Sequence, residues 1–155
     1  MTTVCCYDVY GNAIPVAPEA ITFRPAVYGI FIEDDHILLL RHPQTALWHP
    51  PGSILAPHET PTQAVRYTFR ELTGMTPVLG PLLFVEDQYL VDDERRAWHL
   101  SVLYYALDRP TAMATTLAEM ENSSQPDWKP LAELKRNQMQ FGYEAIQAGW
   151  LRLRL

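Results

Sequence analysis

The chain carries at positions 48–75 the stretch W-H-P-P-G-S-I-L-A-P-H-E-T-P-T-Q-A-V-R-Y-T-F-R-E-L-T-G-M. Thr60 is a favourable N-cap, Pro61 suits the first helical position, and Gln63 completes a capping box. Apolar residues then recur three and four positions apart, and Gly74 stands where a left-handed C-terminal cap is wanted. The stretch therefore predicts a capped amphipathic helix of about four turns.

A loop of stiff and small residues, Pro50-Pro51-Gly52-Ser53, leads into this helix. Loops of this kind before a helix let backbone N–H groups approach an anion, so Gly52 and Ser53 are candidate substrate-binding residues. The same pattern is also typical of an ordinary strand, loop and helix, because short motifs often match by chance.

The stretch resembles the box of the Nudix (MutT-type) hydrolases, Gly-x5-Glu-x7-Arg-Glu-U-x-Glu-Glu-x-Gly-U, in which U is a bulky apolar residue. Five of the nine fixed positions match, namely Glu59, Phe69, Glu71, Gly74 and Met75. The other four carry Ser53 for the opening glycine, Tyr67 for the arginine, and Thr68 and Leu72 for two glutamates. The chain is thus similar to this family, with a degenerate box, over roughly residues 24–150.

The resemblance implies an α/β fold, namely a Nudix-like α/β/α sandwich with helices on both faces of a mixed β-sheet. It implies a single domain over residues 1–155, in which 1–23 form an N-terminal extension or hairpin and 52–75 form the box loop and helix. It also implies a hydrolase that cleaves a phosphoanhydride in a nucleoside diphosphate linked to another moiety, with Mg²⁺ or Mn²⁺ as cofactor.

The replacements remove acids with which the family holds its metal. Positions 68, 71 and 72 share one patch of a helix, and here they carry Thr68, Glu71 and Leu72. By resemblance, Glu71 and Glu59 are the predicted metal ligands and catalytic residues of a weakened site. Leu72 falls on the buried arc of the helix, so we interpret it as a core residue.

An acid from outside the helix is expected to complete this metal site. Mg²⁺ binds through one or two carboxylates when substrate phosphates and waters supply its other ligands. Glu86 is the first catalytic candidate. The remaining candidates are loop and turn acids, each also typical of a solvated surface, namely Asp87, Asp92, Asp93, Glu94, Glu119 and Glu121.

Histidines offer an alternative metal site. His49 and His58, together with Glu59 and Glu71, make a mixed nitrogen and oxygen ligand set that suits zinc or manganese. Their spacing matches no standard zinc pattern. The competing interpretation is that both histidines are loop residues packed against Trp48 and the neighbouring prolines.

Basic and aromatic side chains are candidates for recognising a nucleotide-like substrate. Arg24 begins one predicted strand and Arg41 ends another, so both are candidate substrate-binding residues. Four aromatic residues on predicted strands are candidates for stacking a base, although burial in the core is commoner, namely Tyr89, Trp98, Tyr104 and Tyr105.

Composition indicates a small protein with one core, since the chain has 155 residues and is 48% hydrophobic. A net charge of −6 argues against binding a nucleic-acid backbone. No apolar run is long enough to span a bilayer, and the adjacent Cys5 and Cys6 are unsuited to a disulfide. We therefore expect a cytoplasmic protein with no membrane or nucleic-acid partner. A homodimer is a further possibility that the resemblance implies, because members of the family are often dimers.

Apolar runs separated by turn signals predict the remaining elements. They are three hairpins with strands at 7–10 and 14–16, 26–32 and 37–41, and 78–90 and 98–107. A polar, mobile loop is predicted at 111–126, and a helical stretch is predicted to begin at Asp127. The last prediction is a helix over 143–151, interrupted near Gly149.

Two functions of different class follow from these features. In the first, the chain is a slow hydrolase that uses Glu71, Glu59 and an acid outside the helix. In the second, it is a non-catalytic member of the fold that binds a nucleotide-like ligand or a protein partner in the same cleft.

Overall fold

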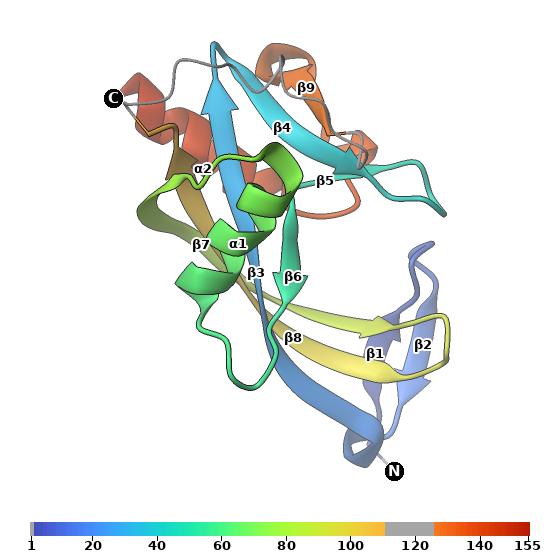
Figure 1. Ribbon diagram of the computed structural model, residues 1–155. Coiled ribbons are helices and arrows are strands. Elements are labelled where there is room, and N and C mark those ends of the chain that lie inside the picture. The colour runs from blue at the N-terminus through green and yellow to red at the C-terminus, as the bar shows by residue number, and fades with distance from the viewer. Residues whose placement is uncertain (1, 111–125) are drawn as a thin grey trace.

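The computed structural model describes residues 2–110 and 126–155. A curled mixed sheet runs through the molecule, with α1 (Pro61–Thr73) on the near face and α2 (Tyr143–Arg154) on the far face (Figure 1). The described strands follow the order β2-β1-β7-β8-β3-β4-β5, while β6 pairs with β3 and β9 pairs with β4. This arrangement confirms the predicted α/β/α sandwich.

The other elements follow one another along the described parts of the chain. In chain order they are β1 (Val4–Tyr7), β2 (Ala13–Val16), η1 (Pro18–Ala20), β3 (Ile21–Glu33), β4 (His36–Arg41), β5 (Trp48–His49), β6 (Gly52–Ile54), β7 (Val78–Val91), β8 (Ala97–Asp108), β9 (Asp127–Pro130), η3 (Leu131–Glu133) and η4 (Arg136–Gln138).

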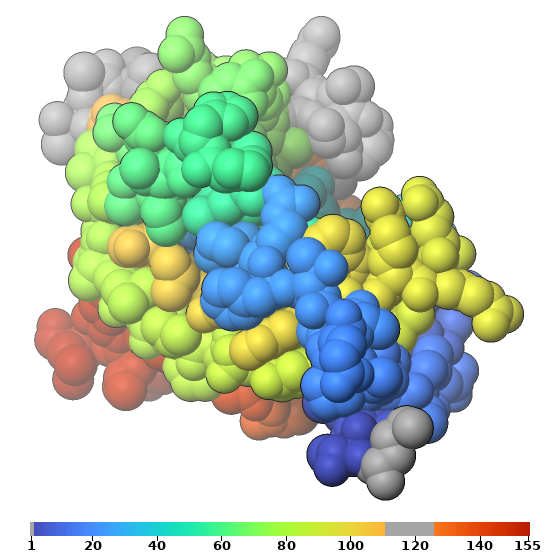
Figure 2. Space-filling view, turned by 90° about the horizontal axis from the view of Figure 1, so that it is seen from below, coloured from blue at the N-terminus to red at the C-terminus, as the bar shows by residue number. Residues whose placement is uncertain are grey.

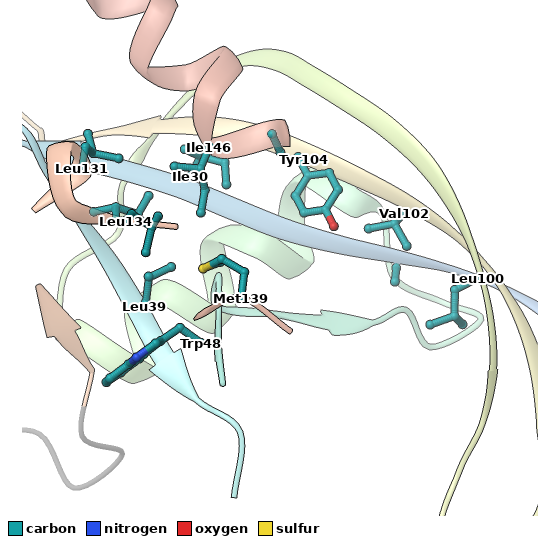
Figure 3. Packing of buried hydrophobic residues seen from close by; sticks show 13 residues of the cluster. Ile30, Leu39, Trp48, Leu100, Val102, Tyr104, Leu131, Leu134, Met139 and Ile146 are labelled. Carbon is teal, nitrogen blue, oxygen red and sulfur yellow. The ribbon is translucent and has the colours of Figure 1, made fainter. Parts of the chain in front are cut away.

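β3 is a central strand whose side chains alternate between the two faces of the sheet. Ala26 and Ile30 pack on the α2 side with Ile146. Val27 and Phe31 pack on the α1 side. The sheet therefore separates two apolar cores, and Figure 3 shows the one on the α2 side.

α1 has both of the caps that the sequence predicts. The hydroxyl of Thr60 accepts the backbone N–H of Gln63, and Gly74 adopts a left-handed conformation with φ 76° while its N–H bonds to the carbonyl of Arg70. The helix buries its apolar stripe against β3 and β6. Leu72 is only 7% exposed, which confirms its interpretation as a core residue.

The three predicted hairpins are present as β1–β2, β3–β4 and β7–β8. The first strand of the N-terminal hairpin, predicted at 7–10, instead covers 4–7. The reason is that the Asp8 carboxylate accepts the backbone N–H groups of Tyr10 and Asn12, which fixes these residues as the turn. Cys5 and Cys6 are free thiols, as expected.

Two C-terminal predictions are wrong. Residues 127–130 form strand β9 rather than the start of a helix, because they pair with β4 along Ile37↔Lys129 and Leu38↔Trp128. α2 continues through Gly149 without interruption. Gly149 packs so closely on the sheet that an added Cβ would lie 2.8 Å from Ile30 Cγ2, so the glycine serves close packing rather than a break.

The predicted loop at 111–125, with the candidate acids Glu119 and Glu121, lies outside the described residues. Among the helices that the structure describes, none has the length and apolar character needed to cross a membrane.

Candidate functional site

The box loop is anchored on the first half of β3. In the space-filling view the green box loop lies directly beside this blue part of the strand (Figure 2). An added Cβ on Gly52 would lie 2.1 Å from the carbonyl oxygen of Val27, so only glycine fits there. Ser53 pairs with Val27, and the Arg24 guanidinium donates to the carbonyl of Leu55. Gly52 and Arg24 thus hold the loop in place.

Glu59 has a local partner in place of the arginine found in the family's box. Its Oε1 accepts the backbone N–H of Ala56 at 2.7 Å. Tyr67, at the position of that arginine, is 62% exposed. A tyrosine cannot make the bidentate ion pair that an arginine makes with a carboxylate, and the backbone contact orients Glu59 instead.

The box patch, which we define as Thr68, Glu71 and Leu72, presents a single carboxylate to solvent. Glu71 is exposed, Thr68 is half-buried and Leu72 is buried. Within residues 2–110 and 126–155, no three His, Cys, Asp or Glu side chains gather as a metal site. The patch therefore fits a divalent ion only as one carboxylate ligand, with phosphate oxygens and waters as the rest.

His49 is a packed loop residue. Its ring stacks on Phe141 with centroids 5.2 Å apart, and its Nδ1 lies 2.8 Å from the carbonyl oxygen of Pro50. Burial lowers the pKa of the imidazole, which the Pro50 carbonyl opposes, so the neutral form is favoured. His58, by contrast, is exposed. His49, His58, Glu59 and Glu71 are therefore not gathered as a closed set of ligands.

A cleft of about 850 Å³ lies on the α2 side of the sheet. Its walls come from the N-terminal hairpin, the second half of β7, the loop at 42–44 and the segment at 136–144. Its lining includes Tyr7, Tyr28, Glu86, Gln88, Arg136 and Phe141. The volume is in the range of small-molecule sites.

Gln140 joins two of these walls. Its Nε2 donates to the carbonyl oxygen of Val9 at 2.8 Å, and its Oε1 accepts the hydroxyl of Thr45 at 2.7 Å. The backbone N–H of Gln140 also donates to the carbonyl of Trp48 at 2.7 Å. One side chain thus fastens the tip of the N-terminal hairpin to the loop that precedes β5.

Of the predicted site residues, Glu86 lines the cleft, as do four of the other candidate acids, Asp87, Asp92, Asp93 and Glu94. The described lining does not include Arg24, Arg41, Gly52, Ser53, Glu59 or Glu71. Arg41 instead lies over the ring of Trp48, with its guanidinium carbon 4.5 Å from the centroid. The cleft reaches the box loop at Ile54, whereas the sheet lies between the cleft and α1, which carries Glu71. The structure therefore brings Glu86 into the cleft and leaves the box residues around the loop and α1.

The floor of the cleft holds a short hydrogen-bond network. Glu86 Oε1 accepts the hydroxyl of Tyr104 at 2.5 Å and Nε2 of Gln88 at 3.3 Å. Burial, followed by the contact with Glu86, raises the pKa of Tyr104, so this phenol stays protonated and donates. Tyr104 follows Val102 and Leu100 along β8 in the α2-side core (Figure 3).

Aromatic rings wall the cleft above this network. Tyr28 makes an edge contact with Phe141, with centroids 4.8 Å apart, and lies 6.0 Å from Tyr104. Burial raises the pKa of Tyr28 to about 12. Neither Tyr28 nor Phe141 was expected at the site from the sequence. Alternation along β3 would have placed Tyr28 on the face of Ala26, but no local signal marks Phe141.

The aromatic candidates from the sequence have structural partners. Tyr104 is buried in the core. Tyr89 stacks on His99 with centroids 4.3 Å apart, and Trp98 Nε1 donates to Asp92. Tyr105 packs against the α1-side core.

Charged side chains at the rim of the cleft are paired with one another. Arg96 bonds to Asp92 at 3.1 Å and lies 3.4 Å from Glu94, while Arg136 is paired with Glu144. Acids outnumber bases in the lining. Both arginines of the described lining, Arg96 and Arg136, are therefore paired with carboxylates, and this lining is net negative.

A curled mixed sheet lies between two helices, with a capped loop and helix on one face and a cleft on the other, which is the architecture of an α/β/α sandwich. A model of the NUDIX domain matches residues 22–149, and the chain belongs to this family. No curated protein is significantly similar to the sequence.

Solved structures of similar fold are Nudix proteins of low sequence identity. A NUDIX hydrolase from Nitrosomonas europaea is 15% identical, with a TM-score of 0.58 over 84% of this chain and 90% of that one. A MutT NUDIX hydrolase from Burkholderia pseudomallei is 21% identical, with a TM-score of 0.59 over 82% and 98%. A bifunctional NMN adenylyltransferase/ADP ribose pyrophosphatase from Francisella tularensis, complexed with AMP and a Mn ion, is 21% identical, with a TM-score of 0.55 over 85% and 42%.

Proposed function

We propose that this protein is a slow Nudix hydrolase that cleaves a phosphoanhydride in a nucleoside diphosphate linked to another moiety. The observation that carries the proposal is that Glu71 stays exposed on a complete, capped box helix whose loop is held on β3. Family membership supports the reaction class, and the structural neighbour solved with AMP and a Mn ion supports a nucleotide ligand.

The metal ligands on this proposal are Glu71 and, secondarily, Glu59. When bound, a Mg²⁺ or Mn²⁺ ion neutralises diphosphate charge and lowers the pKa of a bound water. Glu71 contributes one carboxylate. Glu59 has one oxygen on the N–H of Ala56, so its other oxygen is the one available to a ligand. The loss of two glutamates from the box is the physical reason to expect slow turnover.

The decisive test is phosphate release from a panel of nucleoside diphosphate derivatives with Mg²⁺, Mn²⁺ or Zn²⁺. We expect Glu71→Gln to lower kcat at least tenfold, since even indirect partners of a metal are worth about 10–100-fold. Glu133→Gln, the same change at an exposed acid in η3, serves as the control and should keep full activity. Activity that survives Glu71→Gln unchanged would exclude this assignment.

A second candidate is metal-independent binding without catalysis. It is favoured by the buried Leu72 and by the lack of a three-ligand metal group in the described residues. Calorimetric titration of the same ligands in EDTA separates the two candidates. Binding in EDTA together with no turnover at any metal concentration would support the second and rule out the first.

Two further expectations accompany the proposal. The free thiols Cys5 and Cys6 support a reducing compartment, and hence the cytoplasm. Tyr7 is 49% exposed on the N-terminal hairpin, the candidate interface of a homodimer. Light scattering of the eluted protein would decide between monomer and dimer.

A further inference from the structure

The floor of the cleft presents hydrogen-bond acceptors to a ligand. Both of the hydrogen bonds that described residues donate to Glu86 end on Oε1, which leaves Oε2 for a ligand. Gln88 donates to Glu86 through Nε2, so the amide oxygen of Gln88 is also available to accept a hydrogen bond from a ligand. If the Gln88 amide were flipped by 180°, its oxygen would face the Glu86 carboxylate, and two acceptors would repel each other. The contact with Glu86 therefore fixes the orientation of this amide.

These acceptors share one face of the sheet. Glu86 pairs with Val102 and Gln88 pairs with Leu100, and both partners belong to the α2-side core. Residues two apart on a strand point to the same side. Glu86 Oε2 and the amide oxygen of Gln88 thus form an acceptor pair inside the cleft.

The surroundings of this pair favour a flat ring with N–H donors. Tyr28 and Phe141 supply planar walls, and the rim arginines are held by carboxylates. A net negative lining attracts the positive edge of a donor-bearing ring and disfavours a phosphate at the same place. The phosphates of a nucleotide therefore belong outside this part of the cleft.

We propose that the cleft selects a guanine base and that Glu86 is the residue that determines this specificity. Guanine carries adjacent N–H donors at N1 and N2, which complement two acceptors. Adenine places an acceptor at N1 beside its amino group, which would face a carboxylate oxygen lone pair to lone pair. The inference rests on the proposed function, since it names the base of the proposed nucleoside diphosphate.

This role differs from the metal ligand that the sequence predicts for Glu86. The carboxylate faces the α2 side, whereas α1 and the box patch lie on the other face. A specificity role predicts that removal of the charge changes ligand affinity and base preference. A metal role predicts instead a loss of kcat with every base alike.

The test is calorimetric titration of GDP, ADP, CDP and UDP into the wild type, Glu86→Gln and Asp87→Asn. Asp87 is the matched control: it also borders the cleft, but it is the next residue along β7, so its side chain points to the other face from Glu86 and its carboxylate pairs with His99. We expect the wild type to prefer GDP at least tenfold over ADP, a margin typical of hydrogen bonds to a charged group. Glu86→Gln should abolish this preference, since a glutamine amide suits adenine, whereas Asp87→Asn should keep it.

A second variant guards against a folding defect in the first. Gln88→Met removes one acceptor without changing charge and should reduce the GDP preference severalfold. Equal binding of all four nucleotides, or a GDP preference that survives both changes, overturns the inference and leaves the proposed function standing. GDP-selective binding without turnover supports the inference and overturns the hydrolase. No nucleotide binding overturns both.

Discussion

On one face of the sheet α1 packs Leu72 where the family's box has a glutamate, while on the other face Glu86 and Gln88 line a cleft. The first region has the family's backbone with one exposed acid, and the second has a hydrogen-bonded polar network beside aromatic walls. Local caps and core packing therefore maintain the box helix independently of its metal ligands. Scaffold and chemistry are separable in this fold.

The largest effect should come from returning the family's acid to the box patch. Leu72→Glu would bury an unpaired carboxylate among Phe69 and Val65, and we expect about 3–5 kcal/mol lower free energy of unfolding. Urea denaturation measures it. Tyr67→Glu, at an exposed position of the same helix, should change stability by less than about 0.5 kcal/mol. An unchanged urea midpoint for Leu72→Glu would mean that position 72 of α1 is not buried in the core.

A smaller effect is expected at the floor of the cleft. Tyr104→Phe keeps the ring and removes the hydroxyl that Glu86 accepts, which should cost about 1–2 kcal/mol of unfolding free energy. Tyr105→Phe is the control, because this neighbouring ring packs on the α1 side, and it should stay close to wild type. If the two variants are equally stable, the network does not hold the cleft together.

The smallest effect concerns His49, which ends β5 just before the box loop and stacks on Phe141 of the cleft wall. Its pKa is lowered in the folded protein, mainly by burial, while in the unfolded chain it lies near the ordinary value of 6.5. Folding therefore disfavours the protonated ring. The contribution of His49 to stability is complete above about pH 6.5 and is lost as the pH falls through the lowered pKa. Unfolding curves at pH 7.5 and 5.5 should show this loss in wild type and in His58→Phe, and less of it in His49→Phe.

Sequence reasoning succeeded where the signal is local. Thr60 and Gly74 mark the ends of α1 because capping depends on a few neighbouring backbone groups. The three hairpins follow from apolar runs and turns, and Leu72 follows from helical periodicity. Each of these needs only a short window of the chain.

The cleft could not be predicted from the sequence, because a short window of the chain does not contain it. Tyr28, Glu86 and Phe141 come from distant parts of the chain, and only the sheet and the segment before α2 bring them together. Strand β9 was missed because its partner, β4, is nearly ninety positions away. The local sequence of this segment favours a helix, but pairing with β4 makes it a strand. Such pairing is a tertiary effect that intrinsic helix propensity does not include.

The tether from Gln140 to Val9 has a practical consequence for ligand screening. The family match begins at residue 22, yet Tyr7 and Val9 belong to the wall of the cleft. A polypeptide trimmed to the family boundaries would open that wall to water and leave the half-buried Gln140 amide without its acceptor. Fragment libraries run against such a trimmed protein would then report on a shallower pocket than the one that is built when the N-terminal hairpin is present.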